Sequence, residues 1–130
     1  MSEVAMKRLV LESWMLLIYF ELIMKSSDLK HVFDTVKRHQ VTPTPPSAQI
    51  SAERLCHAVD LACVLYVKRV ECLQRSSATT RLLRRHGWNA ELVIGAQLAP
   101  AKRHAWCEIN GVVINDKPHV CATYQVFERC

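Results

Sequence analysis

The change from helix-forming to strand-forming sequence at Gly87 constrains the fold more than any other feature of this chain. Before it, residues 4–39 contain neither glycine nor proline and consist mainly of good helix formers. After it, short runs that favour β-structure follow one another at 91–95, 104–109, 112–115 and 124–127. A block of helices followed by neighbouring strands is typical of an α+β protein. We therefore expect N-terminal helices followed by a small antiparallel sheet.

Local signals divide the helical part. Residues 4–39 form one long helix or two consecutive ones, because Ser26, Ser27 and Asp28 are suitable N-cap residues in their middle. Three prolines within residues 42–46 cannot continue a helix, since proline lacks the amide donor. A second helical stretch opens at Ser51. A third runs from Cys72 to His86, with Gly87 as its C-terminal cap.

Chain length limits the number of domains. With 130 residues, half of them apolar, the chain can close one hydrophobic core but not two. We expect a single domain over 1–130. It comprises a helical part at 1–40, a proline-rich linker at 41–50 and a core at 51–130 that carries the candidate site.

The formal net charge of +5 is concentrated in the middle of the chain. Residues 68–103 hold eight Lys or Arg against Glu71 and Glu91. Nucleic acid, an anionic peptide or an acidic partner protein would each suit such a segment, and a solvated helix face is the ordinary alternative. Charge alone does not separate these interpretations.

The six cysteines would form a disulfide framework only in a secreted chain. The apolar run after Lys7 and Arg8 is interrupted by Glu12, and no clear cleavage site follows, so we expect a cytoplasmic protein. No Cys-x-x-Cys pair occurs and the gaps between cysteines are irregular, so neither metal nor cofactor is expected.

The nearly continuous apolar stretch 9–24 is shorter than the roughly 20 residues of a membrane span, and it carries Glu12 and Glu21. It is expected to form a buried helix. Peripheral membrane contact is an alternative that we do not predict.

Cys72 occupies the position in the sequence best suited to a nucleophile. The amides and dipole at the start of a helix stabilise a thiolate. A reactive thiolate also needs an imidazole as its proton partner and a third group that orients the imidazole. His104 and Asp116 are the candidates for these roles. Without further support, a cysteine, a histidine and an aspartate spread in this way would usually be a core thiol and two surface polar residues.

The turn between the strands at 104–109 and 112–115 decides whether His104 and Asp116 meet. In a two-residue turn at Asn110-Gly111, His104 would face Lys117, and Asp116 would point to the other side of the sheet. In a three-residue loop over 109–111, with Gly111 in the left-handed conformation, His104 faces Asp116 directly. We predict the three-residue loop.

That register has consequences for neighbouring residues. Trp106 and Ile114 would share the face of the imidazole-carboxylate pair and shield it from water. Glu108 is a fallback acid, ranked behind Asp116 because it lies near the tip of the hairpin. Gln74 is close in sequence to the cysteine, and we assign it no role.

Several runs in the second half of the chain resemble a known family. They are Cys-Leu-Gln-Arg-Ser (72–76), Leu-Leu-Arg-Arg-His-Gly (82–87), Glu-Leu-Val-Ile-Gly (91–95), His-Ala-Trp-Cys-Glu (104–108) and Gly-Val-Val-Ile-Asn-Asp (111–116). Over residues 51–116 the chain resembles the transglutaminase-like leader peptidase of lasso-peptide biosynthesis. The resemblance implies a papain/transglutaminase-like fold and a catalytic triad of Cys72, His104 and Asp116.

The resemblance also implies an activity and partners. The expected protein is a cytoplasmic cysteine protease that removes the leader from a ribosomally made precursor, so that a separate ATP-dependent cyclase can close the core peptide. The first 50 residues do not look like a small β-rich recognition module, so a separate leader-recognition protein is expected. Cys107 departs from the apolar residue that is commoner in the family. The alternatives are a transglutaminase-like acyl transferase and a non-catalytic basic binding protein.

Overall fold

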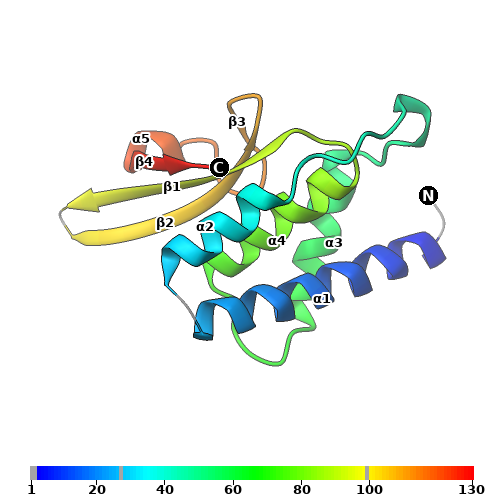
Figure 1. Ribbon diagram of the computed structural model, residues 1–130, viewed down its shortest axis with the longest axis horizontal. Coiled ribbons are helices and arrows are strands. Elements are labelled where there is room, and N and C mark those ends of the chain that lie inside the picture. The colour runs from blue at the N-terminus through cyan, green and yellow to red at the C-terminus, as the bar shows by residue number, and fades with distance from the viewer. Residues whose placement is uncertain (1–2, 27, 99) are drawn as a thin grey trace.

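The computed structural model describes residues 3–26, 28–98 and 100–130 and contains helices followed by an antiparallel sheet (Figure 1). The helices are α1 (Glu3–Ser26), α2 (Leu29–Arg38), α3 (Ala52–Val64), α4 (Cys72–Arg85) and the short α5 (Val120–Thr123), with a 3-10 turn at Pro46–Ala48. The strands are β1 (Ala90–Leu98), β2 (Ala101–Ile109), β3 (Val112–Val113) and β4 (Gln125–Arg129). They lie in the order β3-β2-β1-β4. The predicted α+β fold is confirmed.

Capping residues set the helix boundaries as expected. α2 begins after Asp28, whose Oδ1 accepts a hydrogen bond from the His31 amide at 3.1 Å. α4 ends in a Schellman motif around Gly87, which has φ +90°. The Gly87 amide donates to the Arg84 carbonyl and the Trp88 amide to the Leu83 carbonyl. Of the two alternatives for residues 4–39, the structure has two consecutive helices, and the expected glycine cap is confirmed.

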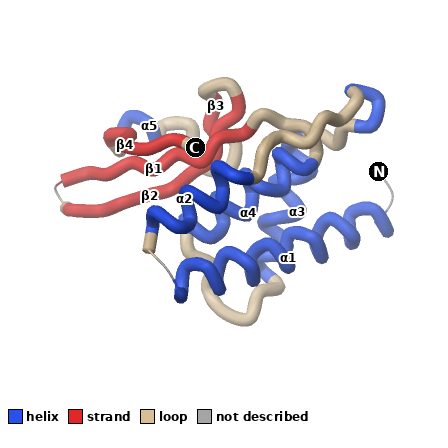
Figure 2. The backbone as a smooth tube through the Cα atoms, in the orientation of Figure 1, coloured by secondary structure: helices blue, strands red, loops and turns tan. Residues whose placement is uncertain are grey.

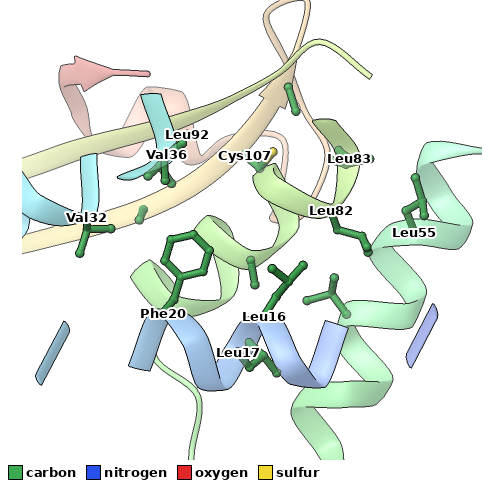
Figure 3. Close-up of a cluster of buried hydrophobic side chains, with 14 of the residues drawn as sticks. Leu16, Leu17, Phe20, Val32, Val36, Leu55, Leu82, Leu83, Leu92 and Cys107 are labelled. Atoms are coloured by element: carbon green, nitrogen blue, oxygen red, sulfur yellow. The ribbon is translucent and has the colours of Figure 1, made fainter. Parts of the chain in front are cut away.

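α1 to α4 gather on one side of the sheet (Figure 2). α4 packs against α1, α3, β1 and β2 and so forms the centre of the core. Figure 3 shows Leu16, Leu17 and Phe20 of α1 on one side of α4, and Val36 of α2 beside Leu92 of β1 on its other side. The site residues on α4 and β2 are therefore held by a shared apolar core.

α1 is apolar around most of its circumference, yet only one of its faces is buried. Leu11, Met15 and Leu22 are exposed, so the expectation of a buried helix is wrong for the outer face. The reason is that α2, α3, α4 and the sheet all lie on the inner side of this helix. No helix in the part of the chain that the structure describes is long and apolar enough to cross a membrane.

The hairpin between β2 and β3 corrects the predicted register. Ile109 pairs with Val112 and Glu108 with Val113, so the turn contains two residues. Asn110 and Gly111 have φ of 51° and 79°, as a type I′ turn requires. The predicted three-residue loop is wrong. Asparagine enters the left-handed region readily, and the type I′ turn matches the twist of the two strands.

His104 and Asp116 nevertheless meet, because β3 ends before the register reaches them. The Ile114 amide donates to the Cys107 carbonyl at 3.0 Å, and the chain then leaves the ladder. The Cys107 amide donates to Oδ1 of the Asn115 side chain at 2.7 Å, where a continued strand would offer a backbone carbonyl. The bend at Asn115 frees Asp116 from the alternation of the strand.

The predicted shielding of the site by Trp106 and Ile114 on one face is also wrong. Trp106 belongs to a small cluster with Val93 and Val120, whereas Ile114 packs against the main core beneath the sheet. The one-residue difference in register accounts for this, since it moves a side chain to the opposite face.

Candidate active site

A pocket of about 430 Å³ lies where the start of α4, the start of α2 and β2 converge. Cys72 and His104 both line it. Its apolar wall is formed by Met24, Leu29, Val32, Leu73 and Ile94, and Asp28, Glu71 and Arg103 add charge. Within the residues that the structure describes, Cys72 and His104 share this pocket without a hydrogen bond between them.

Cys72 differs from the other cysteines whose side chains are described. It is exposed and is the first residue of α4, and the side chain of the N-cap residue Glu71 does not bond the amides of that helix end. By contrast, burial raises the pKa of Cys56 and Cys130 to about 11 and that of Cys107 to about 12. Burial also raises the pKa of Cys63. These four remain neutral thiols near pH 7, so Cys72 is the suitable nucleophile among the described cysteines.

His104 and Asp116 form a hydrogen-bonded pair through Nε2 and Oδ2. Burial alone would raise the pKa of Asp116, but the hydrogen bonds from His104 and from the Lys117 amide outweigh it and hold the pKa below its usual value. Asp116 is therefore a carboxylate near neutral pH. Because Nε2 is engaged, Nδ1 is the imidazole nitrogen left to serve a reacting group.

Aromatic side chains hold the His104 ring from the outer face of the sheet. Tyr124 stacks on it with ring centroids 5.2 Å apart, and Trp106 lies 6.1 Å away. Gly95 pairs with His104 in the ladder, and a Cβ there would lie 2.7 Å from the Cβ of Tyr124. The absence of a side chain at Gly95 thus lets Tyr124 reach the imidazole. Sequence reasoning missed Tyr124, which it expected only as part of a strand.

A buried polar link joins the nucleophile helix to the strand of the histidine. Asn115 Nδ2 donates to Ser76 Oγ at 3.0 Å, and Ser76 Oγ donates to the Ala105 carbonyl at 3.0 Å. Asn115 Oδ1 also accepts from the Cys107 amide. We call these two side chains the Asn115–Ser76 bridge. Sequence reasoning missed it, although both residues lie in the runs that carry the family resemblance.

Two residues weighed from the sequence have other partners. Gln74 is 2% exposed and donates through Nε2 to the Leu17 carbonyl, so it fastens α4 to α1. Glu108 is 1% exposed and accepts from Trp106 Nε1 at 2.7 Å and from Arg129 at 2.8 Å. Asp116, and not Glu108, bonds the imidazole.

Comparison with known proteins identifies the superfamily of the chain. A 56-residue stretch is 39% identical to the microcin J25-processing protein McjB of Escherichia coli, and it covers 43% of this chain and 27% of that protein. The match therefore spans about a quarter of the relative's length. No solved structure matches significantly. The family profile described as the transglutaminase-like superfamily matches residues 14–129, which is nearly the whole chain, and the chain therefore belongs to this superfamily.

Proposed function

We propose that this chain is a cysteine peptidase that removes the leader from a ribosomally made lasso-peptide precursor. The observation that carries the proposal is the pocket lined by both Cys72 and His104, in which His104 is also bonded to Asp116. The relative from Escherichia coli is a processing protein for microcin J25, which favours a peptide as the substrate. In this proposal a separate protein recognises the leader and a separate cyclase uses the released core peptide.

The reaction begins when His104 accepts the thiol proton of Cys72 at Nδ1, and the amides at the start of α4 stabilise the sulfur anion. The Cys72 thiolate then attacks the carbonyl carbon at the leader-core junction. The Cys72 amide is a donor for the oxyanion that forms. Asp116 acts by orienting the imidazole and stabilising its charged form.

Collapse of this intermediate breaks the peptide bond. The imidazolium of His104 gives its proton to the leaving amine, which is the new N-terminus of the core peptide, and the leader remains bound as a thioester on Cys72. His104 then takes a proton from water. The resulting hydroxide attacks the thioester, releases the leader carboxylate and regenerates the thiol.

The basic segment offers little support for a purely binding role. Of its eight basic residues, Arg84 is buried, Arg75 pairs with Asp60 at 2.8 Å and Arg85 pairs with Glu12 at 3.3 Å. The segment is therefore dispersed through the fold and partly neutralised.

Mass spectrometry of the precursor encoded beside this protein's gene tests the proposal. The precursor is incubated with the chain and the leader-recognition protein, and parent, Cys72→Ala and Cys63→Ala are compared. We expect cleavage at one junction by the parent and by Cys63→Ala, which keeps the pocket intact. Cys72→Ala and His104→Ala should abolish it, and Asp116→Ala should leave weaker activity.

Three outcomes would contradict the proposal. Full cleavage by Cys72→Ala would show that Cys72 is not the nucleophile. With an added primary amine, a product in which the leader is joined to that amine in preference to water would assign acyl transfer instead. An intact precursor, with salt-sensitive binding that survives Cys72→Ala, would indicate the binding role.

A further inference from the structure

Among the described residues, β3 covers only one end of the β2 edge that it faces. β3 covers Glu108 and Ile109 of this strand. The amide and carbonyl of Cys107 also point to this edge, where they bond Asn115 and Ile114. Because β2 pairs with β1 without a register shift, its residues alternate strictly between the two edges. The backbone groups of residues 101, 103 and 105 therefore point to the same edge as those of Cys107.

Beyond Cys107 the protein supplies fewer partners for this edge. The Ala105 carbonyl accepts from the Ser76 hydroxyl at 3.0 Å. For the outward-pointing backbone groups of Arg103 and Ala101, no partner at this edge occurs among the residues that the structure describes. Residues 101–103 are exposed, and the β1–β2 hairpin extends past the helices in Figure 1. We call residues 101–105 of β2 the open edge.

The open edge begins at the candidate active site. Arg103, His104 and Ala105 line the same pocket as Cys72. Ser76, one turn after Cys72 on α4, contacts the edge at Ala105. The open edge and the nucleophile therefore border the same pocket.

We propose that the peptide substrate binds as an added β-strand on the open edge, with its main chain bonded to Arg103 and Ala101. An unpaired strand edge is a template for an extended chain, and in this mode alternate side chains enter pockets that give specificity. The pocket beside the edge is walled by Leu29, Val32 and Leu73, so it takes an apolar side chain of the substrate. This inference rests on the proposed peptidase function and names how its substrate is held.

The charge of the edge favours a peptide over a second copy of this chain. Lys102 and Arg103 are both exposed on the short open segment. Edge-to-edge pairing of two copies would bring these like charges together, which is one way proteins prevent such pairing. A separate extended peptide carries no such penalty.

Binding to the Cys72→Ala protein tests the inference without depending on cleavage. Synthetic peptides tiled across the neighbouring precursor are titrated by calorimetry, and the tightest binder is then N-methylated at each backbone amide in turn. An added strand directs every second amide to β2, so we expect losses of roughly tenfold at positions two apart and little change between them. A scan without this alternation would overturn the proposal.

A matched pair of protein variants tests the same point from the other side. Arg103→Pro removes the amide donor at the open edge, where proline is tolerated, whereas Arg103→Ala keeps the donor and removes only the side chain. We expect Arg103→Pro to bind the peptide roughly tenfold more weakly than Arg103→Ala, with both proteins folded by circular dichroism. Equal affinities would contradict the inference.

Amide hydrogen exchange resolves the case in which Arg103→Pro does not fold. In the Cys72→Ala protein, the Arg103 amide should become protected when peptide is added, whereas the Lys102 amide, which faces β1, should change little. Protection of Arg103 that rises with protein concentration in the absence of peptide would assign the edge to a second copy. Cleavage without strand-like binding would refute this inference alone, and strand-like binding without cleavage would refute the peptidase alone.

Discussion

Replacing Asn115 with alanine should destabilise the protein by removing the Asn115–Ser76 bridge. Asn115 is 7% exposed and makes two buried hydrogen bonds through its side chain. Oδ1 accepts from the Cys107 amide at 2.7 Å, and Nδ2 donates to Ser76 Oγ at 3.0 Å. Alanine fills neither role and leaves both partners within the core.

The magnitude follows from these two contacts. Cys107 is 0% exposed, so its orphaned amide costs about 1–3 kcal/mol. Loss of the bond to Ser76 costs about 1 kcal/mol more. We expect the free energy of unfolding to fall by roughly 2–4 kcal/mol. Since Asp116 follows directly, the bond to His104 should also loosen, and kcat should fall more than KM rises.

Urea denaturation followed by circular dichroism measures the loss, with Asn89→Ala as the matched control. Asn89 is exposed, so that variant should stay within about 0.5 kcal/mol of the parent. In a double-mutant cycle, Asn115→Ala and Ser76→Ala should couple by about 1 kcal/mol, because they share one hydrogen bond. If Asn115→Ala loses no more stability than Asn89→Ala, the bridge does not hold the site together.

Three further predictions concern Arg84, Gly95 and Asp116. Arg84 is buried and donates to the carbonyls of three residues, Val36, His39 and Ala90, so Arg84→Met should lower the free energy of unfolding in urea by about 3 kcal/mol. Arg84→Lys should recover only part of this loss, and full recovery would contradict a role for the guanidinium fork. Gly95→Ala should lower the stability measured by thermal unfolding by about 1–3 kcal/mol and should slow cleavage, because the added Cβ displaces the Tyr124 ring from His104. Unchanged stability would show that the added Cβ is not crowded by Tyr124. The pKa of Asp116 is lowered in the folded protein. The pair with His104 therefore stabilises the fold fully above the ordinary carboxyl pKa of about 4. This stabilisation is lost as the pH falls through the lower pKa of the folded state. Urea titrations at a series of pH values should therefore show the stability difference between the parent and Asp116→Asn shrinking below about pH 4, and a constant difference would contradict the carboxylate pairing.

The order of elements could be predicted from the sequence because the signals are local. Asp28 caps α2 and Gly87 ends α4 through contacts within a few residues of the chain. The division of the chain into a helical part, a linker and a core as one domain over 1–130 stays a prediction. The three proposed site residues came from helix-start chemistry and from ordered runs of residues, which are also properties of sequence.

The turn at Asn110-Gly111 shows where local reasoning failed. Requiring His104 to face Asp116 in a regular ladder led to the wrong loop length. The error was the assumption that β3 continues to Asp116, whereas it ends at Val113. Where a strand ends depends on which hydrogen-bond partners its backbone groups find, and these partners cannot be identified from the residues of the strand alone.

By itself, the sequence determined the α+β order of the elements, the placement of Cys72 at a helix start and the family to which the chain belongs. Only the tertiary structure decided that the Asn115 side chain replaces a strand carbonyl, that Tyr124 covers His104 and that residues 101–103 of β2 are exposed where the strand reaches the pocket. The physical reason is the separation along the chain between the residues that interact. Caps and turns depend on neighbouring residues, whereas these three features join segments that meet only after the core has closed.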